Sequence, residues 1–148
     1  NKKFQFLNIR LPGVVGYQIN DKNRPWLCKI VNRLKENDDV TIFNSSKPFN
    51  NILDSYEIYR FINFLKNKKL KNDNLNLSAS KPMILRKLIS KIQFSFLSKS
   101  KVKFSKRKSK YFTISTSKVY SDYKYKTSTT SEIVDRYLKK FPDSLINY

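Results

Sequence analysis

Four consecutive polar residues in the C-terminal part of the chain have side chains suited to contacts with nucleic acid. They are Ser115, Thr116, Ser117 and Lys118. Hydroxyl groups both donate and accept hydrogen bonds, so a row of them can contact phosphate oxygens, 2′-hydroxyl groups and the edges of bases. The ammonium group of Lys118 adds a point charge that suits a phosphate. An ordinary polar turn is the alternative interpretation of the same tetrapeptide.

A run of basic residues precedes this tetrapeptide. No acidic residue lies between positions 74 and 121, and Phe104 and Tyr111 are interleaved with the positive charges. A solvated loop is the alternative interpretation of such a run. We expect it to contact the phosphates of RNA through these side chains: Lys99, Lys101, Lys103, Lys106, Arg107, Lys108 and Lys110.

The charge of the whole chain indicates a polyanionic partner. Lysine and arginine total 31 residues against 11 aspartates and glutamates, which gives a formal net charge of +20 over 148 residues. Repulsion at this level destabilises a compact state unless a polyanion neutralises it. Nucleic acid is therefore the expected partner, and an anionic membrane surface is the alternative.

The residues that metal sites and catalysis commonly use are scarce. The chain has no histidine and one cysteine, Cys28, which we expect in the core because it lacks a histidine base. It also lacks a glycine-rich phosphate loop and a clustered pair of carboxylates. We therefore expect a protein that is not an enzyme and that has no cofactor, no metal and no small-molecule substrate.

The order of several motifs is similar to that of a known family. Residues 114–118 read I-S-T-S-K, residues 119–122 read V-Y-S-D, and Glu132 is followed by two apolar residues. Upstream, Pro25 precedes I-V-N-R-L-K at 30–35 and N-S-S-K at 44–47. Together they resemble the small-subunit ribosomal protein S-eight family.

The resemblance implies a structural constituent of a small ribosomal subunit. Such a protein binds the central domain of the small-subunit rRNA, supports its assembly and contacts neighbouring small-subunit ribosomal proteins. The resemblance places RNA contacts at Ser115, Thr116, Ser117 and Lys118, and it adds Glu132 as a buried brace for that loop. A basic accessory subunit of an organellar membrane complex is the alternative function, although no apolar run approaches the roughly 20 residues of a membrane-spanning helix.

The composition also suggests a cellular location. Asn, Lys, Ile, Phe and Tyr are abundant, whereas Gly13 and Gly16 are the only glycines. The abundant residues have A/T-rich codons, which indicates an organellar genome. We expect a mitochondrial ribosome, with a plastid-type organelle as the alternative.

Apolar periodicity predicts the elements that position these residues. We expect a helix at 25–35, a strand at 40–43, a second helix at 49–65, and strand-like alternation at 75–77, from 92 to 96 and at 112–114. Residues 82–92 also fit a helical stripe. We expect the apolar stripes of both helices in the core: Trp26 lies in the stripe of the first helix, and the stripe of the second comprises Phe49, Ile52, Leu53, Tyr56, Tyr59 and Ile62.

The expected fold class is α+β with two small lobes. Residues 1–24 form an irregular N-terminal extension. Residues 25–80 form an N-terminal α/β lobe of helices with a short sheet, and residues 81–148 form a C-terminal antiparallel, β-rich RNA-binding lobe.

Overall fold

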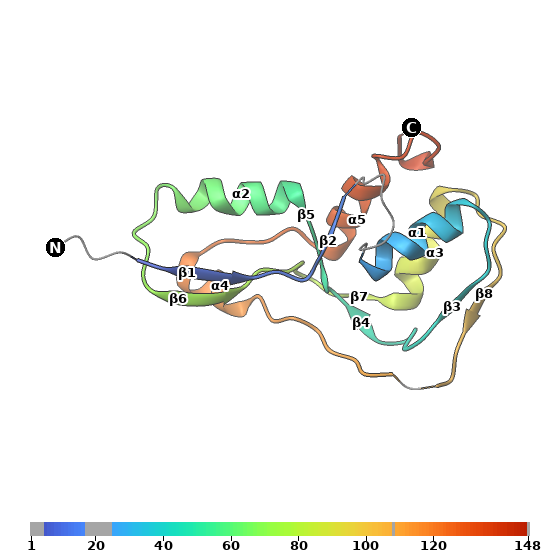
Figure 1. The fold of residues 1–148 in the computed structure, drawn as a ribbon, viewed down its shortest axis with the longest axis horizontal. Coiled ribbons are helices and arrows are strands. Elements are labelled where there is room, and N and C mark those ends of the chain that lie inside the picture. Colours follow the sequence, from blue (N-terminus) through green and yellow to red (C-terminus); the bar gives the residue numbers. More distant parts are fainter. Residues whose placement is uncertain (1–4, 17–24, 108, 148) are drawn as a thin grey trace.

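The computed structural model describes residues 5–16, 25–107 and 109–147, and it has the mixed α+β composition expected from the sequence. Five α-helices, short strands and one 3-10 helix make up the described part of the chain (Figure 1). In chain order these are β1 (Leu7–Arg10), β2 (Gly13–Val15), α1 (Trp26–Lys35), β3 (Val40–Ile42), β4 (Pro48–Phe49), β5 (Ile52–Asp54), α2 (Ser55–Leu65), β6 (Asp73–Asn76), β7 (Met83–Ile84), α3 (Leu85–Ser95), β8 (Val102–Phe104), α4 (Ser117–Tyr123), α5 (Thr130–Leu138) and η1 (Leu145–Asn147).

The strands pair two by two, and most of the pairs are parallel. β1 pairs with β6, β2 with β5 and β3 with β8 in parallel, whereas β4 and β7 are antiparallel. The pairs β3–β8 and β4–β7 each join a strand from before residue 80 to one from after it. Parallel pairing requires a long connection between the paired strands, and the connection from β2 to β5 contains α1.

Residues 7–15 were expected to be irregular, but they form β1 and β2. Ile9 lies opposite Leu75 of β6, and the buried side chain of Val15 lies opposite Asp54 of β5. A Cβ atom on Gly13 would lie 3.2 Å from the Cβ of Pro25, so a small residue lets β2 pass close to the start of α1. Apolar pairing at these positions outweighs the irregularity suggested by the neighbouring proline and glycine.

The helices follow the expected pattern in some places and depart from it in others. α1 and β3 lie where the sequence predicts them. The second helix starts later than expected, because Asp54 caps it by accepting a hydrogen bond from Glu57 N–H at 2.9 Å. The strand expected from residue 92 is wrong, since α3 continues to Ser95 with buried residues at helical spacing: Leu85, Leu88, Ile89 and Ile92.

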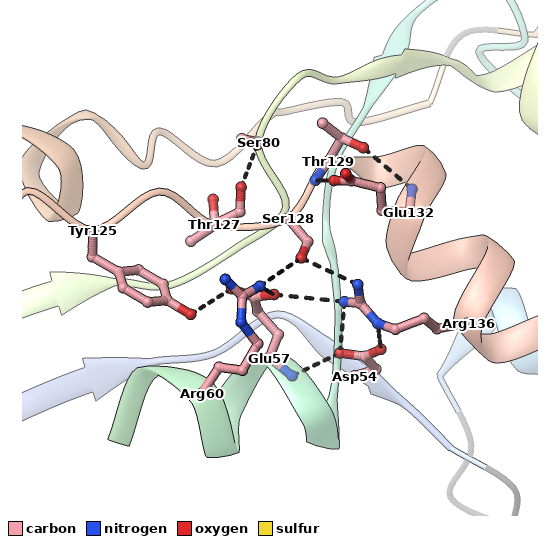
Figure 2. Close-up of polar contacts among 10 residues, drawn as sticks. All are labelled: Asp54, Glu57, Arg60, Ser80, Tyr125, Thr127, Ser128, Thr129, Glu132 and Arg136. Atoms are coloured by element: carbon pink, nitrogen blue, oxygen red, sulfur yellow. Dashed lines mark hydrogen bonds and ion pairs between the residues drawn. The ribbon is translucent and has the colours of Figure 1, made fainter. Parts of the chain in front are cut away.

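A buried polar network joins α2 to α5 (Figure 2). Glu57, which is fully buried, receives a hydrogen bond from Tyr125 at 2.8 Å and lies 3.0 Å from an Arg60 nitrogen. Arg136 contacts Asp54, and both arginines donate to Ser128 Oγ. Burial and the hydrogen bond to Glu57 raise the pKa of Tyr125. The network fixes the start of α2 against α5, next to the loop that carries Asn50 and Asn51.

Candidate ligand site

An aromatic hollow of about 460 Å³ lies between the start of α1, the β4 region and the segment that follows β8. The aromatic residues of its lining are Trp26, Phe43, Phe49, Tyr111 and Phe112. Trp26 and Phe49 have ring centroids 5.9 Å apart at an interplanar angle of 56°. Trp26 is 44% exposed and Phe49 is half-buried, so the prediction that both belong to the core is wrong for Trp26 and incomplete for Phe49. We call this space the aromatic hollow.

A second hollow of about 520 Å³ adjoins the first and carries the positive charge. The two hollows share Asn44, Lys47, Ser109 and Tyr111, and the second adds Lys106, Arg107 and hydroxyl groups from Ser45, Ser46 and Ser105. No acidic residue lines either hollow among the described residues. We call this second space the basic hollow.

The two hollows together fit a ligand with a flat ring at one end and an anionic group at the other. Aromatic side chains bind the faces of planar rings, and hollows of this size enclose small molecules. Lysine, arginine and hydroxyl groups are common ligands of phosphate oxygens. Lys47 is placed to contribute to both hollows, and its Nζ lies 5.9 Å from the centroid of the Tyr111 ring.

The basic run predicted from the sequence is divided by the structure. Lys106, Arg107 and Lys110 line the hollows. Lys103 is an exposed residue of β8. Lys99 and Lys101 are also exposed, and their backbone N–H groups donate hydrogen bonds to the side-chain oxygens of Asn37 and Asp39. Lys108 lies outside the described residues.

The hydroxyl tetrapeptide does not follow a strand. Residues 112–114 are extended but unpaired with any described strand, and Ser117 begins α4. Ser115 Oγ and Ser117 Oγ lie 2.8 Å apart, and Thr116 N-caps α4 without a side-chain hydrogen bond. Lys118 is paired with Asp73, and this hydrogen bond raises the pKa of Lys118 and lowers that of Asp73. Ligand contact by the tetrapeptide stays a prediction.

Glu132 has a different role from the one expected. It is exposed, and it accepts a hydrogen bond from Thr129 N–H at 2.6 Å while Thr129 Oγ1 accepts one from Glu132 N–H at 3.2 Å. This is a capping box that starts α5. The bond from the Thr129 backbone lowers the pKa of Glu132. Its partner is therefore its own helix and not the loop at 115–118.

The described residues contain no group of three or more acidic, cysteine or histidine side chains placed to hold a metal ion. None of the helices in the described part is both long and apolar enough to cross a bilayer.

The fold is similar to part of several enzymes of known structure. A UDP-N-acetylglucosamine 4-epimerase from Bacillus cereus matches 90% of this chain at 15% identity with a TM-score of 0.66. A UDP-glucose 4-epimerase from Thermotoga maritima, solved with UDP-glucose, matches 90% at 14% identity with a TM-score of 0.67. The Bordetella bronchiseptica enzyme WbmG, in complex with NAD, matches 95% at 12% identity with a TM-score of 0.62.

The match covers less than half of each of these proteins. The chain spans 44% of the Bacillus cereus protein, 46% of the Thermotoga maritima protein and 45% of WbmG. No protein-family model and no curated protein sequence matches the chain.

These structures overturn the ribosomal interpretation. The resemblance to the S-eight family is wrong, and so are the ribosomal role, the membrane-complex alternative, the rRNA partner and the ribosomal neighbours drawn with it. The expectations of a non-enzyme and of no small-molecule substrate are contradicted as well, because the neighbours are enzymes and two of the three are named with bound small molecules. A short run of common polar residues in a lysine-rich chain carried too little information to identify a fold.

Proposed function

We propose that this chain is the nucleotide-sugar-binding part of an NAD(P)-linked epimerase or dehydratase. The observation that carries the proposal is the aromatic hollow, which adjoins the basic hollow and shares Lys47 and Tyr111 with it. In a nucleoside diphosphate sugar, the flat base matches the aromatic hollow in chemistry and the diphosphate matches the basic hollow. The neighbours named as UDP-sugar epimerases support the same ligand class.

Different residues of the two hollows would contact the base and the diphosphate of such a ligand. Trp26 and Phe49 supply apolar ring surface for a base. Lys47 and Arg107 supply positive charge for the diphosphate, and neither has an ion-pair partner among the described residues. Charge that is left unneutralised beside an apolar hollow favours an anionic ligand.

The residues of this chain do not fit a dinucleotide cofactor. A dinucleotide-binding turn uses three glycines in the pattern G-x-G-x-x-G between a strand and a helix. The only glycines here, Gly13 and Gly16, do not form that pattern. We therefore assign nucleotide-sugar binding to this chain and no chemical step that passes through NAD.

Trp26 provides a direct test, because it is the only tryptophan of the chain and it lines the aromatic hollow. Its fluorescence, excited at the red edge of its absorption, is followed while UDP-glucose, UDP, uridine or glucose is added. We expect a saturable change with UDP-glucose and UDP, a weaker affinity for uridine and no change with glucose. Equal responses to all four compounds, or no response to UDP, would refute it.

Two expectations from the sequence remain proposals. One is a division of the chain into lobes at 25–80 and 81–148, which limited proteolysis would test. The other is a mitochondrial location, which cell fractionation would test.

A further inference from the structure

Residues 109–114, which we call the strap, form a wall of both hollows without belonging to a sheet. Ser109 and Tyr111 line the two hollows, and Phe112 lines the aromatic one. Figure 1 shows the strap within the long extended segment that runs from β8 to α4 along the lower side of the molecule. No backbone–backbone hydrogen bond joins residues 109–114 to another described residue.

Asparagine side chains take the place of a neighbouring strand. Asn50 is buried, and its Nδ2 donates to Ile114 O at 2.7 Å while its Oδ1 accepts from Ile114 N–H at 2.9 Å. Asn44 repeats this arrangement, with Nδ2 donating to Ser109 O at 3.0 Å and Oδ1 accepting from Ser109 N–H at 3.3 Å. Each amide satisfies both backbone groups of one strap residue, one at either end of the strap.

Asn51 holds the middle of the strap and leaves one atom without a partner. Its Nδ2 donates to Phe112 O at 3.2 Å. Because a carbonyl can only accept, this bond fixes which end of the Asn51 amide faces the strap. Asn51 Oδ1 is then buried without a hydrogen-bond partner among the described residues, in a side chain that lines the aromatic hollow.

The strap is held less firmly than β8, the paired strand that precedes it in the chain. Its side chains add little burial, since Tyr111 is 41% exposed and Phe112 is 64% exposed. Segments with few buried contacts and few hydrogen bonds open at a lower free energy than a packed core does. Ile42, by contrast, is fully buried in β3 and paired with Phe104 of β8.

We propose that the strap is a gate over the ligand site, which opens and closes as one unit and which the asparagines Asn44, Asn50 and Asn51 latch in the closed position. A nucleoside diphosphate in the two hollows favours the closed strap, because Tyr111 and Phe112 then complete the wall around it. The identity of the ligand as a nucleoside diphosphate rests on the proposed function. The movement of the strap as one unit rests on the hydrogen bonds alone.

Two reciprocal variants test whether the strap moves as a unit. Asn44 has a positive φ of 52°, so Asn44→Gly removes the side chain without adding backbone strain. Amide exchange is then measured residue by residue by NMR. Asn44→Gly is expected to speed exchange of the Ile114 amide about tenfold, although the acceptor of that amide on Asn50 is untouched.

Asn50→Ala is expected to speed exchange of the Ser109 amide in the same way. Asn8→Ala is the matched control, because Asn8 bonds Asn74 on the sheet surface and does not touch the strap. The proposal would be overturned if Asn44→Gly speeds amide exchange only at Ser109 and Asn50→Ala speeds it only at Ile114, the residues that lose their own acceptors. If Asn50→Ala fails to fold, the effect of Asn44→Gly on exchange of the Ile114 amide alone decides whether the strap moves as a unit.

Saturating UDP separates this proposal from the proposed function. Slower exchange at both Ser109 and Ile114, in a sample whose Trp26 fluorescence reports binding, supports the gate. Binding without slower exchange overturns the gate and leaves the nucleotide site in place. If Trp26 reports no binding and exchange does not change, the proposed function fails and ligand control of the gate fails with it.

Discussion

Arg136 Nε lies 2.7 Å from Asp54 Oδ2, which joins α5 to the residue that caps α2. A second guanidinium nitrogen of Arg136 donates to Asp54 Oδ1 at 3.2 Å, so the contact is bidentate. The Asp54 side chain is only 2% exposed, and Arg136 also lies 3.5 Å from the buried Glu57. Arg136 is thus the charged partner of Asp54, shares Glu57 with Arg60, and connects two helices that are distant in sequence.

Replacing this arginine should destabilise the fold strongly. Arg136→Met keeps much of the apolar stem but leaves Asp54 without its charged partner. Removing one member of a buried pair leaves an uncompensated charge, so we expect the free energy of unfolding to fall by about 3 kcal/mol. Chemical denaturation followed by circular dichroism measures the difference.

Lys35→Met is the control for that variant. Lys35 lies 3.5 Å from Asp143, but the two side chains are 36% and 53% exposed. We expect a loss of less than about 1 kcal/mol, because water screens such a pair. Equal losses in the two variants would show that the Arg136 network contributes no more than a surface ion pair.

Glu132 should contribute to stability in a way that depends on acid pH. The bond from the Thr129 backbone lowers the pKa of Glu132 below its ordinary value of 4.5. The stability from this group is therefore present above the unfolded-state pKa and is lost as the pH falls through the lower folded-state pKa. Glu132→Gln keeps a capping side chain but cannot titrate, so unfolding free energies between pH 6 and pH 2 should fall less steeply in the variant. Parallel curves would contradict this role.

Tyr125 should have the corresponding effect at alkaline pH. Burial, together with its bond to Glu57, raises the pKa of Tyr125 above its ordinary value of 10.0. Its contribution to stability is complete below the unfolded-state pKa and is lost as the pH rises towards the folded-state pKa. Tyr125→Phe should be less stable at neutral pH by about 1–2 kcal/mol, and its stability should decline less above pH 10. Thermal unfolding from pH 7 to pH 11 compares the two proteins, and identical slopes would count against the assignment.

The sequence predicted those parts of the fold in which local pattern and burial agree. The apolar stripe of α1 and the alternation at β3 are local signals, and the structure places both elements as expected. In α2 the same reasoning chose the wrong face. Tyr56, Tyr59 and Ile62 are exposed, whereas Glu57 and Phe61 are buried. Glu57 could not have been predicted there, because its partner Tyr125 lies 68 residues away.

The candidate site was only partly visible in the sequence. Lys106, Arg107 and Lys110 were identified as phosphate contacts, and they line the hollows. The partner class was wrong, since net charge reports that an anion binds and not which one. Asn44, Asn50 and Asn51 were missed, because an amide that replaces a neighbouring strand has no local signature. The signal that could have drawn attention to them is a cluster of amides on both sides of Phe49.

Lys47 should distinguish the phosphate end of the ligand from the base end. Lys47→Met removes the charge that the two hollows share and keeps the apolar stem. A lost charge-assisted contact is worth about 1.5–3 kcal/mol, so UDP affinity should fall tenfold or more while uridine affinity changes little. Calorimetric titration of both ligands measures this. An equal loss for uridine would place Lys47 at the base, or show that the variant distorts the hollow.

The most direct measurement is photochemical crosslinking of the chain with 5-azido-UDP-glucose, followed by mass spectrometric mapping of the modified peptides. If the two hollows bind a nucleotide sugar, adducts are expected on peptides that contain Phe43 to Phe49 or Tyr111 and Phe112, and excess UDP should suppress them while excess glucose should not. Adducts spread over lysines outside the two hollows, or adducts that excess UDP fails to suppress, would contradict a nucleotide-sugar site in this part of the fold.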